Sequence, residues 1–366
     1  MTAARIDAFL QLGREQGCSD IHLAVGMPPI LRLHGELTPV RYRELDPDEL
    51  ERLLDEILND EQRTQFNKGG DLDLSYESED AGRFRVNLFR KVGGLGATFR
   101  VIPEEIPSLE SLNLPPVIQK FTDLHQGLVL VTGATGTGKT TTLSSMIHHI
   151  NQHRKLTIIT LEDPIEFVHK SAESLIVQRE VGVHVPNFAE GLRAALREDP
   201  DIILVGELRD LETVSLALIA AETGHLVLGT LHTTTATKTL DRIIDALPVE
   251  QKLQGMTSLS QNLRAVVSQS LVRTPDGRGR KAICEIMVMT PAISHLLMSG
   301  KVFQIPSKLQ TGRDQGMQLL DQALLEAVQS KQIDPDDAYR HAVDKKQFQR
   351  FVTDPTLLPT VNLVGQ

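Results

Sequence analysis

The pattern of apolar positions changes character between residues 102 and 124. Before this point, the helical spacing of Ile6, Phe9 and Leu10 predicts an opening helix, and a second helix is predicted to begin after Asp46, with Pro47 at its first position. Short strands are predicted at 20–23, 30–33, 72–74, 84–88 and 97–102, the last three as an antiparallel meander. This mixture predicts a small α+β domain.

Beyond residue 124, continuous apolar runs alternate with helical segments. The runs at 128–131, 156–160, 202–205, 226–231 and 282–288 predict strands of a parallel sheet that helices cover on both faces. Helical spacing also predicts a helix with one apolar stripe made of Leu253, Met256, Leu259, Leu263, Val266 and Val267. The chain after residue 290 has a mostly helical pattern.

These patterns predict an α/β protein with two folded domains. The N-terminal α+β domain spans residues 1–102, and the proline-containing stretch at 103–116 is predicted to be an ordered linker. An α/β core is predicted at 117–290, followed by a helical region at 291–366. Ligands of open parallel sheets bind beyond the carboxyl ends of the strands, so the polar residues that follow each strand are the candidate site.

The first strand of the predicted core is followed by Gly-Ala-Thr-Gly-Thr-Gly-Lys-Thr, which has the P-loop pattern G-x-x-x-x-G-K-[ST]. Glycines let backbone N–H groups turn toward phosphate, and the next helix presents its positive end to the same anion. We expect Lys139 to reach the β- and γ-phosphates of ATP and Thr140 to hold Mg²⁺. The predicted nucleotide-binding residues of the loop are Gly133, Ala134, Thr135, Gly136, Thr137, Gly138, Lys139, Thr140 and Thr141.

Polar residues follow three further strands of the predicted core. Glu162 and Asp163 follow the second strand, Glu207 the third and His232 the fourth. Glu207 is placed to orient or deprotonate water, Glu162 or Asp163 to hold Mg²⁺ directly or through its waters, and His232 to sense the γ-phosphate. The predicted metal ligands are Thr140, Asp163 and Glu207. Singly, each acid could be a helix cap and the histidine structural; together at strand ends, they favour one site.

Two pairs of arginines are candidates for stabilising phosphate charge. Arg193 and Arg197 are four residues apart on a helix predicted before Asp199, so they are expected to share a face. Arg85 and Arg100 lie on predicted strands of the first domain. In P-loop enzymes such cations often come from a neighbouring subunit. For the strand arginines, a solvated or ion-paired side chain is the simpler interpretation by pattern alone.

Composition limits the kinds of partner. The chain has 366 residues and a formal net charge of −10, so strong general affinity for nucleic acid is not expected. No apolar stretch approaches the ~20 residues that span a bilayer, and the N-terminus lacks the pattern of a signal peptide, which favours a cytosolic protein. Cys18 and Cys284 are far apart, and two buried thiols are the expected arrangement.

Four sequence boxes together resemble those of the secretion ATPase superfamily, and most closely the PilT-type retraction ATPases of type IV pili. They are the loop at 133–140, an Asp box at 160–166, a Walker B segment at 199–210 and a His box at 224–233. Smaller matches lie at 19–23 and 178–182. The resemblance covers residues 1 to about 345, and the combination of boxes is far more specific than any single box.

The resemblance implies a homo-hexameric ring whose subunits combine a PAS-like N-terminal domain with a RecA-like P-loop ATPase domain, with ATP and Mg²⁺ between them. Arg85 and Arg100 resemble arginines that close onto the phosphates, and Arg193 and Arg197 a second interface pair. Glu207 corresponds to the catalytic glutamate. The acidic pair of the Asp box and the two histidines of the His box correspond to Glu162, Asp163, His225 and His232. The implied location is cytoplasmic, at the inner face of the cytoplasmic membrane, beside an inner-membrane pilus platform protein and possibly a second pilus ATPase.

Within this superfamily, the sequence favours the retraction branch. Pilus-extension and type II secretion ATPases usually have a longer N-terminal region and a four-cysteine zinc motif, and this chain has neither. The retraction motif has a counterpart at 292–301 that keeps the apolar spacing but not the charges. A PilU-like accessory motor or a divergent paralogue is therefore an alternative, and a pilus assembly or secretion ATPase a more distant one. From other classes, a nucleotide-dependent switch and a DNA translocase are rivals.

Overall fold

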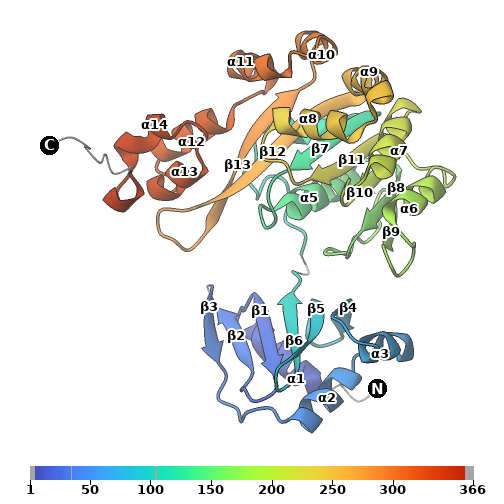
Figure 1. The fold of residues 1–366 in the computed structure, drawn as a ribbon, viewed down its shortest axis with the longest axis vertical. Helices are drawn as coiled ribbons and strands as arrows, with labels where there is room; N and C mark the ends of the chain where they lie inside the picture. The colour runs from blue at the N-terminus through green and yellow to red at the C-terminus, as the bar shows by residue number, and fades with distance from the viewer. Residues whose placement is uncertain (1–4, 34, 104, 359–366) are drawn as a thin grey trace. The chain divides into compact units, whose positions relative to one another are not determined.

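The computed structural model describes residues 5–33, 35–103 and 105–358, and the chain divides into two compact units (Figure 1). The first unit is Met1–Glu105 with Pro164–Val168, and the second is Ile106–Asp163 with His169–Gln366. Residue 104 of the predicted linker and residues 359–366 of the predicted C-terminal region lie outside the described residues. Each unit has its own hydrophobic core, and each is described by itself below.

In the described part of the first unit, six strands form an antiparallel sheet in the order β3-β2-β1-β6-β5-β4. The strands are β1 (Asp20–Ala24), β2 (Ile30–Leu33), β3 (Glu36–Pro39), β4 (Leu72–Ser78), β5 (Gly82–Lys91) and β6 (Gly94–Val101). The predicted meander of the last three is confirmed. Strand β3 was not predicted, because all its side chains are exposed and it therefore lacks apolar alternation.

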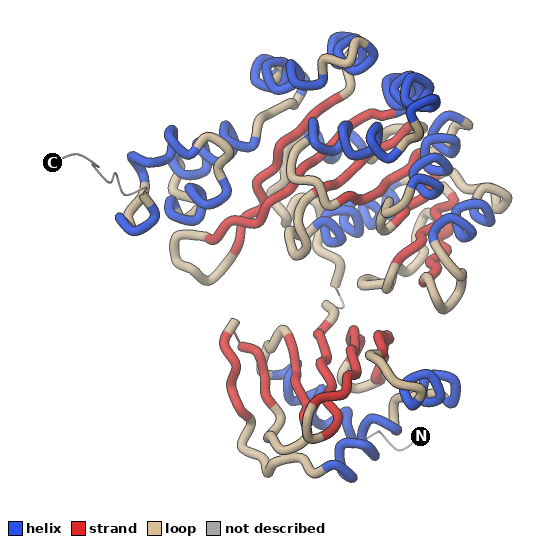
Figure 2. Tube along the Cα trace, viewed as in Figure 1, coloured by secondary structure: helices blue, strands red, loops and turns tan. Residues whose placement is uncertain are grey.

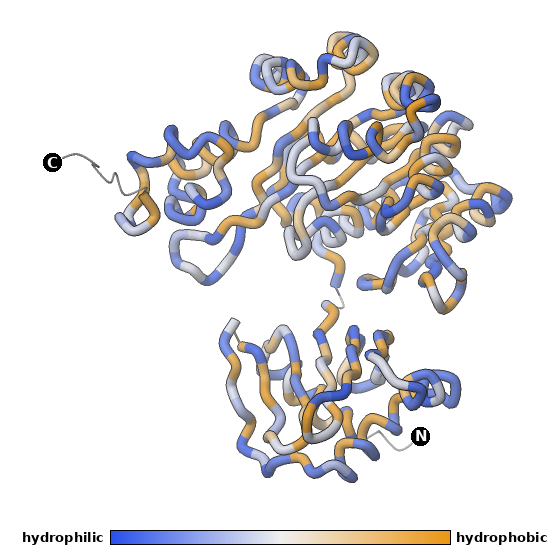
Figure 3. Tube along the Cα trace, viewed as in Figure 1, coloured by the Kyte–Doolittle hydropathy of each residue, from blue (hydrophilic) through white to orange (hydrophobic). Residues whose placement is uncertain are grey.

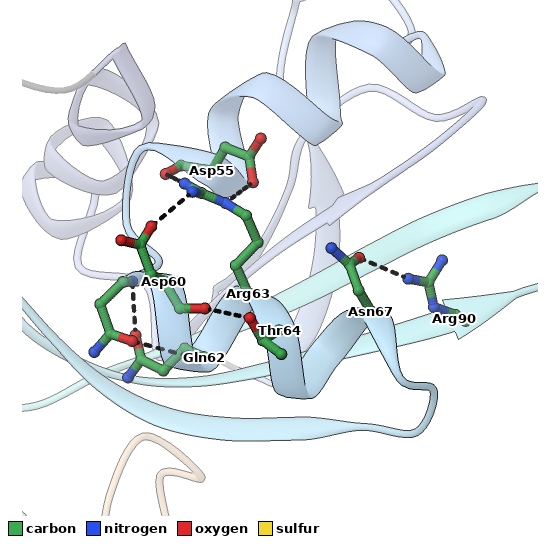
Figure 4. Close-up of polar contacts among 8 residues, drawn as sticks. Asp55, Asp60, Gln62, Arg63, Thr64, Asn67 and Arg90 are labelled. Carbon is green, nitrogen blue, oxygen red and sulfur yellow. Dashed lines mark hydrogen bonds and ion pairs between the residues drawn. The ribbon is translucent and has the colours of Figure 1, made fainter.

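In the described residues of this unit there are three helices, and the α+β prediction for it is confirmed. They are α1 (Arg5–Glu15), α2 (Pro47–Asp55) and α3 (Asp60–Asn67). Asp46 caps α2 as predicted, because its side chain accepts a hydrogen bond from the backbone N–H of Glu49 at 2.8 Å. Helix α3 is almost entirely polar, which concealed it in the sequence. Its N-terminal end is instead fixed by a capping box and by Arg63, which pairs with Asp55 and Asp60 (Figure 4).

In the described part of the second unit, seven strands form a sheet in the order β13-β12-β7-β11-β10-β8-β9 (Figure 2). The strands are β7 (Gly127–Thr132), β8 (Thr157–Glu162), β9 (Leu175–Glu180), β10 (Ile202–Val205), β11 (Leu226–Leu231), β12 (Leu263–Arg273) and β13 (Arg280–Val288). All neighbours pair in parallel except β12 and β13, which form an antiparallel edge. The prediction of an α/β unit is confirmed.

Helices cover both faces of this sheet, which explains why its central strands β7, β8, β10 and β11 are largely apolar (Figure 3). Side chains of α4 (Val117–Phe121) and α5 (Lys139–His153) pack on one face. Those of six further helices pack on the other: α6 (Phe188–Ala195), α7 (Leu211–Glu222), α8 (Ala236–Ala246), α9 (Lys252–Asn262), α10 (Pro291–Met298) and α11 (Ile305–Thr311). Alternate residues of β7 face opposite cores, Leu130 one and Val131 the other.

The C-terminal helices build a smaller core of their own against the β12–β13 hairpin. They are α12 (Leu320–Gln329), α13 (Pro335–His341) and α14 (Lys345–Phe348). Phe348 is fully buried in this core beside Val272 and Ile283 of the hairpin. Short 3₁₀ turns complete the unit at Val249–Gln251, Val302–Gln304, Arg313–Gln315, Gln349–Phe351 and Pro355–Leu357.

Two predictions about the elements were wrong. The helical stripe predicted through Val267 ends early, because α9 stops at Asn262 and β12 begins at Leu263. Val266 and Val267 face the two cores on opposite sides of the sheet, so β12 shows no apolar–polar alternation that would have marked it as a strand. The run at 282–288 is indeed a strand, but it is the antiparallel edge strand β13. Strand β9 was not predicted.

Candidate functional site

The central strands of the second unit bring the predicted motifs to one edge of the sheet. Strands β7, β11, β10 and β8 are consecutive neighbours and run parallel, so their carboxyl ends lie together. The P-loop follows β7, His232 follows β11, Glu207 follows β10 and Asp163 follows β8. This is the edge at which open α/β sheets bind ligands.

The P-loop has a backbone conformation that depends on glycine. The φ angles of Gly133, Gly136 and Gly138 are 145°, 79° and 84°, values that side-chain-bearing residues adopt only with strain. Lys139 begins α5 and is buried, and its Nζ donates to the carbonyl oxygens of Gly133 and Ala134, at 2.9 Å each. The chain thus curls around the lysine and leads into a helix of 15 residues whose positive end faces the loop.

Gln269 is a residue of this site that the sequence did not point to. It lies on β12 and is buried; its Nε2 donates to the carbonyl oxygen of Thr137 at 2.7 Å, and its Oε1 accepts from the Thr142 hydroxyl at 2.8 Å. A Cβ atom added to Gly133 would lie 2.3 Å from the carbonyl oxygen of Gln269. Strand β12 therefore contacts the P-loop directly and helps to fix its conformation. Part of β12 was predicted from the sequence to be helical, so no pattern placed Gln269 beside the loop.

Glu207 lies in a network of charged groups. His232 Nε2 is 3.1 Å from Glu207 Oε1, and Arg209 Nε is 2.8 Å from Glu207 Oε2. Arg209 also reaches Asp163, with 3.6 Å between its Nη1 and Asp163 Oδ2. The hydrogen bond to Glu207 is the main cause that raises the pKa of Arg209 above its ordinary value. The structure thus joins Asp163, Glu207 and His232, as predicted, and adds Arg209, which was not assigned.

The two acids of the Asp box have different surroundings. Glu162 is buried, and its Oε1 accepts hydrogen bonds from the Thr160 hydroxyl at 2.6 Å and from Gln178 Nε2 at 3.0 Å. Asp163, the next residue, is exposed and contacts Arg209. Of the two acids that the sequence left as alternatives, Asp163 is therefore the one with a carboxylate available at the edge of the sheet.

His225 does not lie at this edge. It precedes β11, whereas His232 follows it. Six strand residues separate them, roughly 20 Å at the usual rise per residue. His225 Nδ1 lies 2.9 Å from the carbonyl oxygen of Ala220, so the ring is engaged at the end of α7. The structure therefore does not bring His225 together with the P-loop of the same subunit, because the His box spans the whole length of a strand, and the assignment of His225 to nucleotide binding stays a prediction.

The arginine pair at 193 and 197 is only partly helical. Helix α6 ends at Ala195, so Arg193 lies on the helix while Arg197 lies in the turn that follows. The expectation that both share one helical face was wrong for this reason. Arg193 forms an ion pair with Glu212 on α7, and Arg197 is exposed.

Arg85 and Arg100 belong to the first unit. They are direct cross-strand partners on β5 and β6, so their side chains lie on the same face of that sheet. Arg100 Nε donates to Asp20 Oδ1 at 3.0 Å, and Asp20 is a cross-strand partner of Arg100 as well. Two adjacent guanidinium groups with one buried carboxylate leave this row of side chains with net positive charge.

The oxygen atoms at the sheet edge suit magnesium. Thr140 lies in the first turn of α5, and Asp163 and Glu207 supply carboxylates. Mg²⁺ usually binds one or two carboxylates together with substrate phosphates and water, and does not need a cage of protein ligands. Accordingly, within the described ranges no three His, Cys, Asp or Glu side chains are grouped to hold a metal by themselves.

The fold and the loop define a P-loop ATPase. The chain belongs to the Type II/IV secretion system protein family, whose model matches residues 6–340. It is 46% identical over 343 residues to the type IV pilus retraction ATPase PilT of Pseudomonas aeruginosa, covering 94% of this chain and 99% of that protein. It is 48% identical over 320 residues to a twitching motility protein of Neisseria gonorrhoeae, and this match covers 87% of this chain and 86% of that protein. The family resemblance predicted from the sequence is confirmed.

A solved structure extends this similarity to the fold. The crystal structure of the pilus retraction motor PilT with bound ADP matches with a TM-score of 0.88 at 41% identity, over 94% of this chain and 99% of that chain. None of the helices in the described residues has both the length and the apolar composition needed to cross a bilayer.

Proposed function

We propose that this protein is a motor that uses ATP hydrolysis to retract type IV pili and so drives twitching motility. The observation that carries the proposal is the arrangement of the P-loop, Asp163, Glu207 and His232 at the ends of neighbouring parallel strands. Near full-length similarity to PilT supports the motor function specifically, because the match covers 99% of that relative's length.

In the proposed mechanism, the loop residues 133–141 bind the phosphates and Lys139 neutralises their charge. The Thr140 hydroxyl, Asp163 and Glu207 would hold Mg²⁺, directly or through water, and the chemistry that the ion supplies is neutralisation of phosphate charge. Glu207 orients the attacking water or accepts its proton, and His232, in contact with Glu207 at 3.1 Å, reports the presence of the γ-phosphate.

The proposed motor is a homo-hexamer in which arginines complete the nucleotide site. Arg85 and Arg100 would close onto the phosphates when ATP binds, and Arg193 and Arg197 would act at the interface between subunits. The paired, positively charged row on β5 and β6 supports the first assignment.

We propose 1–102, 103–116, 117–290 and 291–366 as the working division into N-terminal domain, linker, ATPase core and C-terminal region. Closure around the ring would then act on an inner-membrane platform protein of the pilus, from the cytoplasmic face.

An accessory motor that works beside a second pilus ATPase is the alternative. Helix α10, the counterpart of the retraction motif, buries Ile293, Leu296 and Leu297 and exposes Ala292, His295 and Met298. The exposed face of α10 thus lacks the charged Arg and Glu residues of the retraction motif. This loss is the observation that favours the accessory motor as the alternative function.

Deletion of the gene tests the proposal. Hyperpiliated cells without twitching are the expected result, and complementation with the Lys139→Ala variant should fail to restore motility. Bald cells would instead indicate pilus extension and would overturn the retraction function. Partial twitching that only a second ATPase supports would identify the accessory motor.

A further inference from the structure

Arg209 lies between the two carboxylates that we propose to face magnesium. Its Nε is 2.8 Å from Glu207 Oε2 and its Nη1 is 3.6 Å from Asp163 Oδ2. The side chain is 56% exposed, and exposed ion pairs contribute little to stability. The contacts of Arg209 with Asp163 and Glu207 are therefore better explained by a role at the site than by stabilisation of the fold.

We propose that Arg209 is a resident counter-ion that competes with Mg²⁺ for Asp163 and Glu207, and so sets how much magnesium nucleotide binding requires. The inference rests on the proposed function, in which these two carboxylates face the metal. A guanidinium group and a divalent cation that approach the same carboxylates repel each other, so the arginine must withdraw as the metal ion arrives. Arg209 is thus a positioning residue for the site.

The chemistry of arginine fits this role. A guanidinium group is planar and presents donors in more than one direction, so it can bridge two carboxylates, whereas an ammonium group acts as a point charge. Arginine also remains charged at any physiological pH, so the competition persists across that range. The large exposed fraction of the side chain gives Arg209 room to withdraw without disturbing a packed core.

Glu207 has a second partner that remains when Arg209 is removed. His232 Nε2 lies 3.1 Å from Glu207 Oε1, the oxygen that Arg209 Nε does not contact. The orientation of Glu207 should therefore persist in an Arg209 variant. A change in the magnesium requirement can then be separated from a loss of the catalytic step.

The test uses the full-length protein with Arg209→Gln and Arg209→Lys. Arg313→Gln is the matched control, since Arg313 is also 56% exposed and pairs with Glu326 at 2.6 Å in the same unit. Binding of a fluorescent, non-hydrolysable ATP analogue is measured at increasing Mg²⁺ concentration. The Arg209→Gln variant should need roughly 5- to 50-fold less Mg²⁺ for half-maximal binding. Arg209→Lys should fall between it and the wild type, and Arg313→Gln should be unchanged.

An unchanged or increased magnesium requirement in Arg209→Gln would overturn the inference. Weakened binding of the analogue with no weakening for ADP would also overturn it, and would make Arg209 a ligand of the γ-phosphate instead. The proposed function is tested separately by Glu207→Gln. Normal turnover in that variant would refute the catalytic role of Glu207, whereas the magnesium titration of Arg209→Gln is a binding measurement and does not depend on turnover.

Discussion

Gln269 on β12 donates a hydrogen bond from its side-chain amide to the carbonyl oxygen of Thr137 in the P-loop, across 2.7 Å. The same amide accepts a hydrogen bond from Thr142 in the first turns of α5. One buried side chain therefore ties the loop, the helix that follows it and a strand more than a hundred residues away. The shape of the phosphate site depends on this strand as well as on the loop's own glycines.

Replacing Gln269 by Leu should weaken nucleotide binding, because the Thr137 carbonyl and the Thr142 hydroxyl would lose their partner in a buried site. We expect roughly tenfold weaker ADP binding and about 1–3 kcal/mol lower stability, the usual cost of an unsatisfied buried polar group. Calorimetric titration and thermal unfolding measure the two effects. The control is Gln318→Leu. It removes a hydrogen bond from a glutamine side chain to the carbonyl oxygen of Cys284 on β13, which is not part of the P-loop. Equal nucleotide affinity in both variants would contradict the role assigned to Gln269.

Replacing Glu207 by Ala should leave ATP binding intact but lower the turnover rate by roughly 10²–10⁴, as for a lost general base. Steady-state release of phosphate measures the rate, and binding of labelled ATP measures the affinity. Glu326→Ala, which removes an exposed acid that pairs with Arg313, serves as the control. Turnover at the wild-type rate in Glu207→Ala would assign the catalytic role elsewhere.

The two acids of the Asp box should respond differently to substitution by their amides. Asp163→Asn should raise the magnesium concentration needed for turnover, because it removes a charge at the sheet edge. Glu162→Gln should act mainly on stability, by about 1–3 kcal/mol, because the buried carboxylate accepts hydrogen bonds from Thr160 and Gln178. Magnesium titrations and thermal unfolding of both variants separate the effects. The reverse pattern would show that Glu162 is the acid that serves the metal.

His169 should make stability depend on pH. Burial, with a smaller contribution from the charge of His148, lowers the pKa of His169 from its ordinary value of 6.5 to about 4. The unfolded chain therefore binds a proton in this range that the folded chain does not. The free energy of unfolding should be unaffected by His169 above pH 6.5 and should fall as the pH drops from 6.5 to 4, by about 1–3 kcal/mol.

The measurement is the melting temperature as a function of pH. His169→Gln should flatten the decline between pH 6.5 and 4 relative to the wild type, while His295→Gln, which alters an exposed histidine on α10, should not. Identical pH profiles for the wild type and His169→Gln would show that the ring is not held neutral by its surroundings.

A structural feature could be predicted from the local sequence where all the residues that determine it lie in one short segment. The P-loop could be predicted because its glycines and Lys139 act within a few residues, and the cap at Asp46 because its acceptor and donor are three residues apart. The edge of the sheet could be predicted because parallel strands align their carboxyl ends. These features need no knowledge of which distant segments meet.

What the sequence could not show at the site has a different cause, which is dependence on contacts between distant segments. Gln269 acts on a loop that lies far from it in sequence, and nothing near it indicates this. His225 and His232 belong to one sequence box, but an extended strand carries them to opposite edges of the sheet. Glu162 and Asp163 are adjacent, yet only the partners supplied by β9 and Arg209 distinguish the buried acid from the exposed one.

The burial of Phe348 has a practical consequence for anyone who shortens this protein. The family match ends at residue 340, so a shortened protein could be designed to end at that residue. Such a cut would remove Phe348 and leave Val272, Ile283 and Leu324 facing water, so the shortened protein should aggregate even though every ATPase motif is intact. Affinity tags and fluorescent fusions are therefore better attached after residue 358 than at the end of the family match.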